Sequence, residues 1–187
     1  MLRPRRSLRL AAASVLILTV SVGLAGCTPA PTGRSATATG QQIESIPGVE
    51  KATIRADSSL DGFVSRQTIN ITVVVSDGYQ VGDADGAIVW LAQEAWSAGP
   101  KRPGSMGISL EDSSGKPLDW GWKDALAKHG WDKDAGANDG WDVANVDDGV
   151  LASARLIVLT RSAMVSVTGD SWPGPVPETP ANLFVKN

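Results

Sequence analysis

The stretch QTINITVVVS, residues 67–76, decides the fold of this chain. Its apolar residues fall at every second position, with polar residues between them until the run of valines near its end. Side chains alternate between the two faces of a β-strand, so this period of two predicts a half-buried strand. The face expected to be buried carries Ile69, Ile71, Val73 and Val75, and the opposite face carries Thr68, Asn70 and Thr72.

A helix is predicted after this strand, from Asp83 or Asp85 to about Ala98. Either aspartate can cap the free N–H groups of the first turn, and Gly99-Pro100 ends the helix. The apolar residues share one stripe at helical spacing: Ala84, Ile88, Leu91, Ala92 and Ala95, with Trp96 on the flank. This stripe is expected to pack on the apolar face of the strand. Trp90 points away from the stripe, so it is either covered by another segment or exposed.

The remaining segments predict shorter elements separated by glycine- and proline-rich turns. Helices are expected at 41–46 and 122–129, and strands at 49–56 and 105–112. A loop is expected at 58–66, and a turn at 113–116 leads into 117–120. A terminal hairpin is expected from strands 153–160 and 163–168 around Arg161-Ser162, whereas 132–148 is rich in Asp and Gly and is expected to be irregular.

The order of these elements predicts an α+β fold. We expect a two-layer sandwich of a mainly antiparallel sheet and helices, whose first half is similar to ferredoxin-like domains in element order. Residues 46–49, IPGV, also resemble a piece of the small metal-transfer domains of that fold. The Cys-x-x-Cys pair that binds their metal is absent here, so no metal and no other cofactor is expected.

The first 26 residues have the composition of a secretory signal peptide. Four arginines precede an apolar run at 10–23, and small residues follow it. An apolar run of about 14 residues is too short to cross ~30 Å of hydrocarbon as a helix. A retained transmembrane segment is therefore the weaker alternative.

The tetrapeptide Leu24-Ala25-Gly26-Cys27 resembles the lipobox of bacterial lipoproteins. The resemblance implies that the Cys27 thiol receives a diacylglyceryl group and that the signal is cut between Gly26 and Cys27. It also implies a location at the extracytoplasmic face of the cell membrane, held by the lipid. The arginine-rich leader and the bias towards Ala, Gly, Val, Asp and Trp are similar to lipoproteins of actinobacteria. The alternative is an ordinary signal peptide with a cysteine that carries no lipid.

Four segments are expected along the chain. They are the signal peptide 1–26, the lipidated cysteine with a flexible tether 27–40, the globular domain 41–170 and a proline-rich tail 171–187. The tether consists of Thr, Ala, Pro, Gly and Ser with one arginine, a composition that buries little apolar surface. Cys27 is the sole cysteine, so lipidation leaves the domain without disulfides or thiolate chemistry.

The charge of the mature chain limits its partners. Cleavage removes four of the 17 Lys+Arg, which leaves 13 against 20 Asp+Glu, a formal balance of −7. Nucleic-acid binding requires clustered basic residues, which the sequence lacks, so nucleic acid is not expected as a partner. The acidic balance also disfavours flat docking on an anionic bilayer. Attachment is expected to rest on the lipid of Cys27, with an envelope protein or a glycan as the further partner.

Four of the seven tryptophans lie at 120–141, where Gly-Trp-Asp occurs at 130–132 and again at 140–142. One interpretation is a ligand platform, in which Trp131 and Trp141 stack on a sugar or an apolar group. Asp132, Asp142 and Asn138 would then form hydrogen bonds with the ligand. The favoured alternative is that the indoles anchor a loop region to the sheet, since each buries ~150–250 Å².

Other motifs in this part of the chain point to no catalytic residue. Asp132, Asp134 and Asp139 suggest a calcium loop. The EF-hand has Gly at its sixth position and Glu at its twelfth, whereas here Gly136 is fifth and Val143 is twelfth, so the pattern fails. The motif Ser113-x-x-Lys116 matches that of penicillin-binding enzymes but falls in a predicted turn.

His129 is the sole histidine, and it is expected to make a dipole contact at a helix end. We therefore expect a non-catalytic binding or interaction module. The alternative function is a lipid-anchored carbohydrate-active or other hydrolase that uses carboxylates within 120–148.

Overall fold

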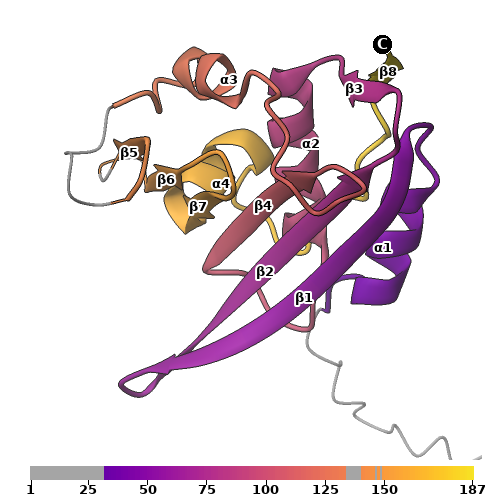
Figure 1. The fold of residues 1–187 in the computed structure, drawn as a ribbon. Helices are drawn as coiled ribbons and strands as arrows, with labels where there is room; N and C mark the ends of the chain where they lie inside the picture. Colours follow the sequence, from indigo (N-terminus) through magenta and orange to yellow (C-terminus); the bar gives the residue numbers. More distant parts are fainter. Residues whose placement is uncertain (1–31, 134–139, 146, 148) are drawn as a thin grey trace, which may run out of the picture.

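Six strands form the main sheet of the protein (Figure 1). The structure is a computed structural model that describes residues 32–133, 140–145, 147 and 149–187. In spatial order the strands are β1 (Val49–Asp61), β2 (Val64–Val75), β4 (Ser105–Glu111), β7 (Ile157–Thr160), β6 (Val150–Ala152) and β5 (Val143–Asn145). β2 and β4 are parallel, and the other neighbouring pairs are antiparallel. β3 (Tyr79–Val81) and β8 (Phe184–Lys186) form a second, two-stranded antiparallel sheet.

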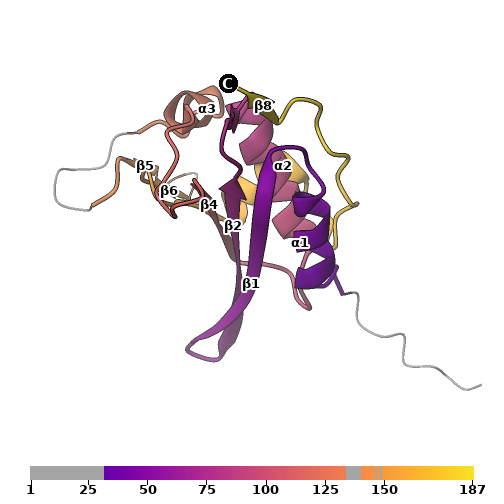
Figure 2. The same cartoon turned by 45° about the vertical axis from the view of Figure 1, so that its right-hand side comes forward.

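Helices cover this sheet and complete a second layer. They are α1 (Ala36–Glu44), α2 (Ala84–Ser97), α3 (Trp122–Lys128) and α4 (Arg161–Thr168). α1 and α2 lie on the same side of the sheet, α1 against β1 and α2 against β2 and β4 (Figure 2). α2 lies in the crossover that the parallel pair β2 and β4 requires. The α+β two-layer prediction is confirmed. Within the main sheet the elements follow the predicted order strand, strand, helix, strand, and the short β3, which was not predicted, lies between β2 and α2. None of the helices described is long and apolar enough to cross a membrane.

The predicted core is confirmed at β2 and α2. The four apolar residues of the strand 67–76 lie within β2 and are each at most 2% exposed. Asp83 caps α2, because its side chain accepts a hydrogen bond of 3.0 Å from the N–H of Gly86. The apolar stripe is buried at Ile88, Leu91, Ala92 and Ala95. Trp90 is also buried, so it is covered by another part of the fold.

The expected flexible tether 28–40 is wrong from residue 33 onwards, because α1 begins at Ala36 and the helix expected at 41–46 is its second half. The Ser35 side chain accepts a hydrogen bond of 3.1 Å from the N–H of Ala38 and caps the helix. Thr39 and Gly40 are buried together with Ile43. Helices in proteins are stabilised mainly by packing, which outweighs the polar, glycine-containing composition of this segment.

The loop expected at 58–66 is wrong, because these residues extend β1 and β2 into one long hairpin. Asp61 pairs with Val64, so the turn holds two residues, Gly62 and Phe63. Gly62 has a φ of 62°, which favours glycine at the first position of a two-residue hairpin turn. The turn chemistry of this one glycine allows both strands to continue to the tip.

The last third of the chain also differs from the prediction. Residues 163–168, expected as a strand, form α4, whose buried Ala163 and Met164 face the interior. β5 lies within the segment expected to be irregular. The segment 171–187 is not a simple tail, because it ends in β8 and buries Leu183 and Phe184.

Candidate functional site

The proposed lipid site, Gly26-Cys27, lies outside the described residues, but its attachment point on the domain is defined. The N–H of Gly33 donates to the carbonyl of Gly99 at 2.9 Å, and the N–H of Arg34 donates to that of Ser97 at 2.7 Å. These bonds hold the start of the domain at the C-terminal end of α2. Because an extended chain spans at most ~3.3–3.6 Å per residue, Cys27 lies within about 20 Å of Gly33.

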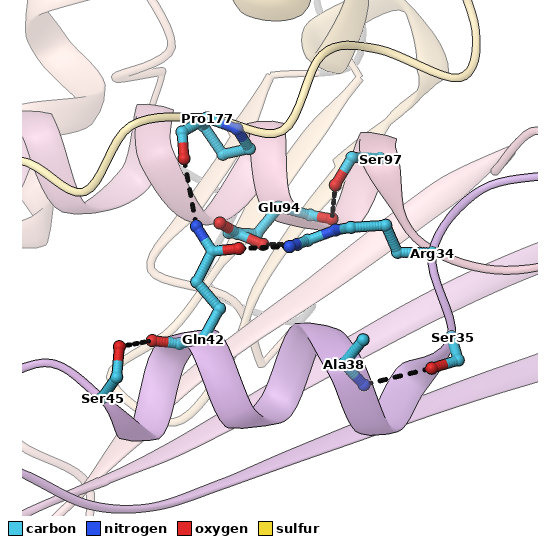
Figure 3. A network of polar contacts seen from close by, with 8 residues as sticks. All are labelled: Arg34, Ser35, Ala38, Gln42, Ser45, Glu94, Ser97 and Pro177. Atoms are coloured by element: carbon cyan, nitrogen blue, oxygen red, sulfur yellow. Dashed lines mark hydrogen bonds and ion pairs between the residues drawn. The ribbon is translucent and has the colours of Figure 1, made fainter.

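A buried polar network lies next to this attachment point (Figure 3). The Arg34 guanidinium forms an ion pair with the carboxylate of Glu94 on α2 and donates a hydrogen bond to Gln42 on α1. Gln42 in turn donates from Nε2 to the carbonyl of Pro177 at 3.1 Å. The network therefore joins the N-terminal segment, two helices and the C-terminal segment.

Glu94 is the ionisable group of this network with a strongly shifted pKa. Its side chain has no exposed surface, and burial raises its pKa from 4.5 to about 7, although the charge and hydrogen bond of Arg34 act in the opposite direction. Sequence reasoning missed this residue. The sequence gives one indication of its burial: the glutamate lies in a predicted helix beside the apolar residues Leu91, Ala92 and Ala95.

The Trp and Asp residues of the predicted platform are only partly suited to a ligand. Trp131 is 2% exposed and stacks on His129, with ring centroids 4.6 Å apart. Trp141 is half-buried, and Asp132 and Asp142 are exposed. Asp142 lies 3.9 Å from the Lys123 ammonium. The buried ring of Trp131 offers no face to a sugar, and the ligand platform stays a prediction.

Asp134 and Asp139, two of the three aspartates of the calcium-loop interpretation, lie outside the described residues. Across 32–133, 140–145, 147 and 149–187, no group of three or more His, Cys, Asp or Glu side chains could hold a metal ion.

His129 contacts a carboxylate of another helix. Its Nε2 lies 2.7 Å from Oδ1 of Asp85 in the first turn of α2. This pair ties the end of α3 to α2 and adds a partner to the expected dipole contact. The two residues are 44 positions apart, so sequence spacing could not have indicated the contact.

A groove runs between α2 and the C-terminal segment, and sequence reasoning did not identify it. It has a volume of about 280 Å³, and its lining includes Trp96, Pro175, Val176 and Pro177. The indole N–H of Trp96 donates to the carbonyl of Ser171 at 2.8 Å, and the Arg102 guanidinium lies 4.9 Å from the Trp96 ring centroid. Val176 is 53% exposed, so an apolar surface is open to a partner at this groove.

Comparison with protein-family models, with curated proteins and with solved structures finds no match to this chain.

Proposed function

We propose that the protein is a bacterial envelope lipoprotein, anchored by a diacylglyceryl group on Cys27 at the extracytoplasmic face of the cell membrane. The observation that carries the proposal is the tetrapeptide Leu24-Ala25-Gly26-Cys27, placed directly after a basic leader and an apolar run. Two acyl chains on one sulfur give stable membrane attachment, which a single chain does not.

The position of the first described residues limits how far the proposed anchor could hold the domain from the membrane. Five residues separate Cys27 from Gly33, whose backbone is already bonded to the domain. A lipid on Cys27 would hold the domain within about 20 Å of the bilayer. This is shorter than the reach expected from a tether that ends at Gly40.

The anchor is tested by Cys27→Ala in a bacterial host that receives a clickable fatty acid. The wild type is expected to take up the label and to fractionate with membranes, whereas Cys27→Ala takes up no label. Thr28→Ala is the matched control, because it changes the adjacent residue and keeps the sulfur. Equal labelling of Cys27→Ala and the wild type would exclude lipid attachment at Cys27.

The domain acts as a non-catalytic binding or interaction module in this proposal. The groove beside Trp96 supports it, because it combines an exposed apolar side chain with rigid prolines. Crosslinking in cells followed by purification is expected to recover an envelope protein or a glycan, and less of it with Val176→Arg. Ala127→Arg, at an exposed position of α3, adds the same charge elsewhere and is expected to leave the yield unchanged. Equal yields from the two variants would exclude the groove as the contact.

A further inference from the structure

The β1–β2 hairpin projects as a narrow arm beyond the rest of the sheet (Figure 1). β4 pairs with β2 only from Thr68 onwards, so residues 64–67 of β2 pair with β1 alone. Two large apolar side chains lie at the tip of the arm, Leu60 with 79% and Phe63 with 108% of their surface exposed. A two-stranded ribbon in water is marginally stable by itself, so this arm gains from a surface that covers its tip.

The arm extends from the end of the domain where the N-terminal segment is attached. Gly33 is bonded to Gly99, and Gly104 of the same α2–β4 connection donates to the carbonyl of Gln67 in β2 at 2.7 Å. Both ribbon views place the hairpin tip and the start of the described chain towards this end (Figures 1 and 2). Phe63 lies four residues beyond Gln67, or about 13 Å along a strand.

These lengths decide what the tip can reach. The chain from Cys27 to Gly33 spans at most about 20 Å, which exceeds the distance of about 13 Å by which the tip lies beyond Gln67. The surface that holds a lipid on Cys27 is therefore within reach of Leu60 and Phe63.

Arginines gather at the base of the arm, although β1 also carries Asp57 and Asp61. Two neighbouring hollows of about 510 and 290 Å³ share Arg66, Gly104 and Arg161, and Arg102 lines the smaller one. Three arginines line these hollows, and one of them, Arg102, is ion-paired with the exposed carboxylate of Asp170. Guanidinium groups match the geometry of phosphate oxygens and bind them through paired hydrogen bonds.

We propose that this end of the domain is a second membrane contact: Leu60 and Phe63 enter the lipid surface, while Arg66 and Arg161 bind phosphates of anionic phospholipids. The inference rests on the proposed anchor, which brings the bilayer within reach. A protruding apolar tip backed by arginines is complementary to a lipid surface, which is apolar beneath its phosphates. The net charge of −7 disfavours flat docking, so the proposed contact is confined to this end.

The protein offers a specific probe for this contact, because its one natural cysteine is Cys27, whose sulfur is blocked by lipidation. Ser65→Cys places a single reactive thiol on the exposed arm, and Lys128→Cys places one on α3 as the control. Each lipidated mature protein is labelled with an environment-sensitive dye and reconstituted on phosphatidylglycerol vesicles that contain acyl-chain-brominated lipid. Bromine quenches the dye only where the dye enters the bilayer.

The Ser65 dye is expected to be quenched and shifted to shorter wavelength, and the Lys128 dye is not. Leu60→Ser with Phe63→Ser should abolish the quenching. Arg66→Gln with Arg161→Gln should remove the preference for phosphatidylglycerol over phosphatidylcholine, by about fivefold per arginine. Because these changes lie on exposed side chains, circular dichroism of each variant is expected to match the parent.

The outcomes separate this inference from the anchor on which it rests. An unquenched Ser65 dye on protein that is held to vesicles by its lipid overturns the second contact and leaves the anchor in place. A dye that is shielded in cells but exposed on vesicles also overturns it, and assigns the tip to a protein partner. A protein without lipid on Cys27 overturns both proposals.

Discussion

Arg34 and Glu94 lie 60 positions apart in the chain, and their side chains form an ion pair between the N-terminal segment and α2. The Arg34 side chain is 19% exposed, whereas that of Glu94 has no exposed surface. Above the raised pKa of about 7, where Glu94 is ionised, Arg34 therefore compensates a charge that would be strongly unfavourable alone at this depth. Together with Gln42 it fixes α1 to the rest of the fold.

The raised pKa of Glu94 predicts that stability falls as pH rises from about 4.5 to about 7. In this window the folded protein retains the proton and the unfolded chain has lost it, so folding is favoured at the acidic end. The effect is on the order of 3 kcal/mol across the whole interval. Urea unfolding at pH 5 and pH 7.5 measures it.

Glu94→Gln should flatten this dependence, because glutamine does not titrate. Glu50→Gln, the same change at an exposed position, is expected to keep the slope of the wild type. Asp112 and Asp147 do not interfere, because hydrogen bonds from Ser114 and Lys133 lower their pKa values below 3.8. The same slope in Glu94→Gln and the wild type would show that Glu94 stays ionised when folded.

Gly33→Ala is predicted to lower the free energy of unfolding by about 1–3 kcal/mol. An added Cβ would lie 2.5 Å from the carbonyl oxygen of Ser97 and 2.8 Å from that of Gly99, both of them backbone atoms. The substitution must therefore displace the backbone bonds that hold the N-terminal segment. Thermal unfolding measures the loss.

Gly40→Ala is the control for that substitution, and it should act in the opposite direction. Its added Cβ would be 3.5 Å from the nearest atom, the carbonyl oxygen of Ala52, which is an ordinary contact. Alanine in a helix interior is better than glycine by about 0.5–1 kcal/mol. A lower melting temperature for Gly40→Ala than for Gly33→Ala would contradict the packing described for α1.

Phe184→Ala is predicted to cost about 3–5 kcal/mol, because the ring is 6% exposed and belongs to the core. Phe63→Ala should change stability by less than about 0.5 kcal/mol, since its ring is fully exposed in water. Chemical denaturation of the two variants compares a buried and an exposed phenylalanine in one chain. Equal costs would show that residues 184–186 do not pack as described.

Tryptophan fluorescence tests the sugar platform directly. The buried ring of Trp131 predicts no change in emission when muropeptide or glycan fragments are added at millimolar concentration. A shift that disappears in Trp141→Phe would instead assign a ligand to the half-buried indole of Trp141.

The parts of the fold that were predicted correctly are those with one strong local period. β2 alternates strictly at Ile69 and Ile71, and α2 has both a capping aspartate and an apolar stripe. The strand predicted at 163–168 was wrong for a physical reason. The valines of this segment alternate as they would in a strand, although the segment forms α4. Contact with α2 and β7 decides the helix there, and that contact is not visible in local sequence.

The candidate site was harder to predict because its residues come from distant segments. The Arg34–Glu94 pair joins a residue assigned to the tether with one on α2, and no local pattern connects them. Leu60 and Phe63 lie in a segment that was expected to be a loop. Isolated apolar residues in a loop do not indicate a function, so this exposed pair was not recognised. The first required the packing of the N-terminal segment on α2, and the second required the register of β1 against β2.

The bridge between Arg34 and Ala98 determines how a mechanical load would enter the domain. Any pull on the N-terminal segment reaches the fold first through the backbone hydrogen bonds from Gly33 and Arg34 to Gly99 and Ser97. α1 lies behind this joint and is not unwound until it breaks. A tether fixed in this way can transmit drag on the domain to its anchor without loosening the core.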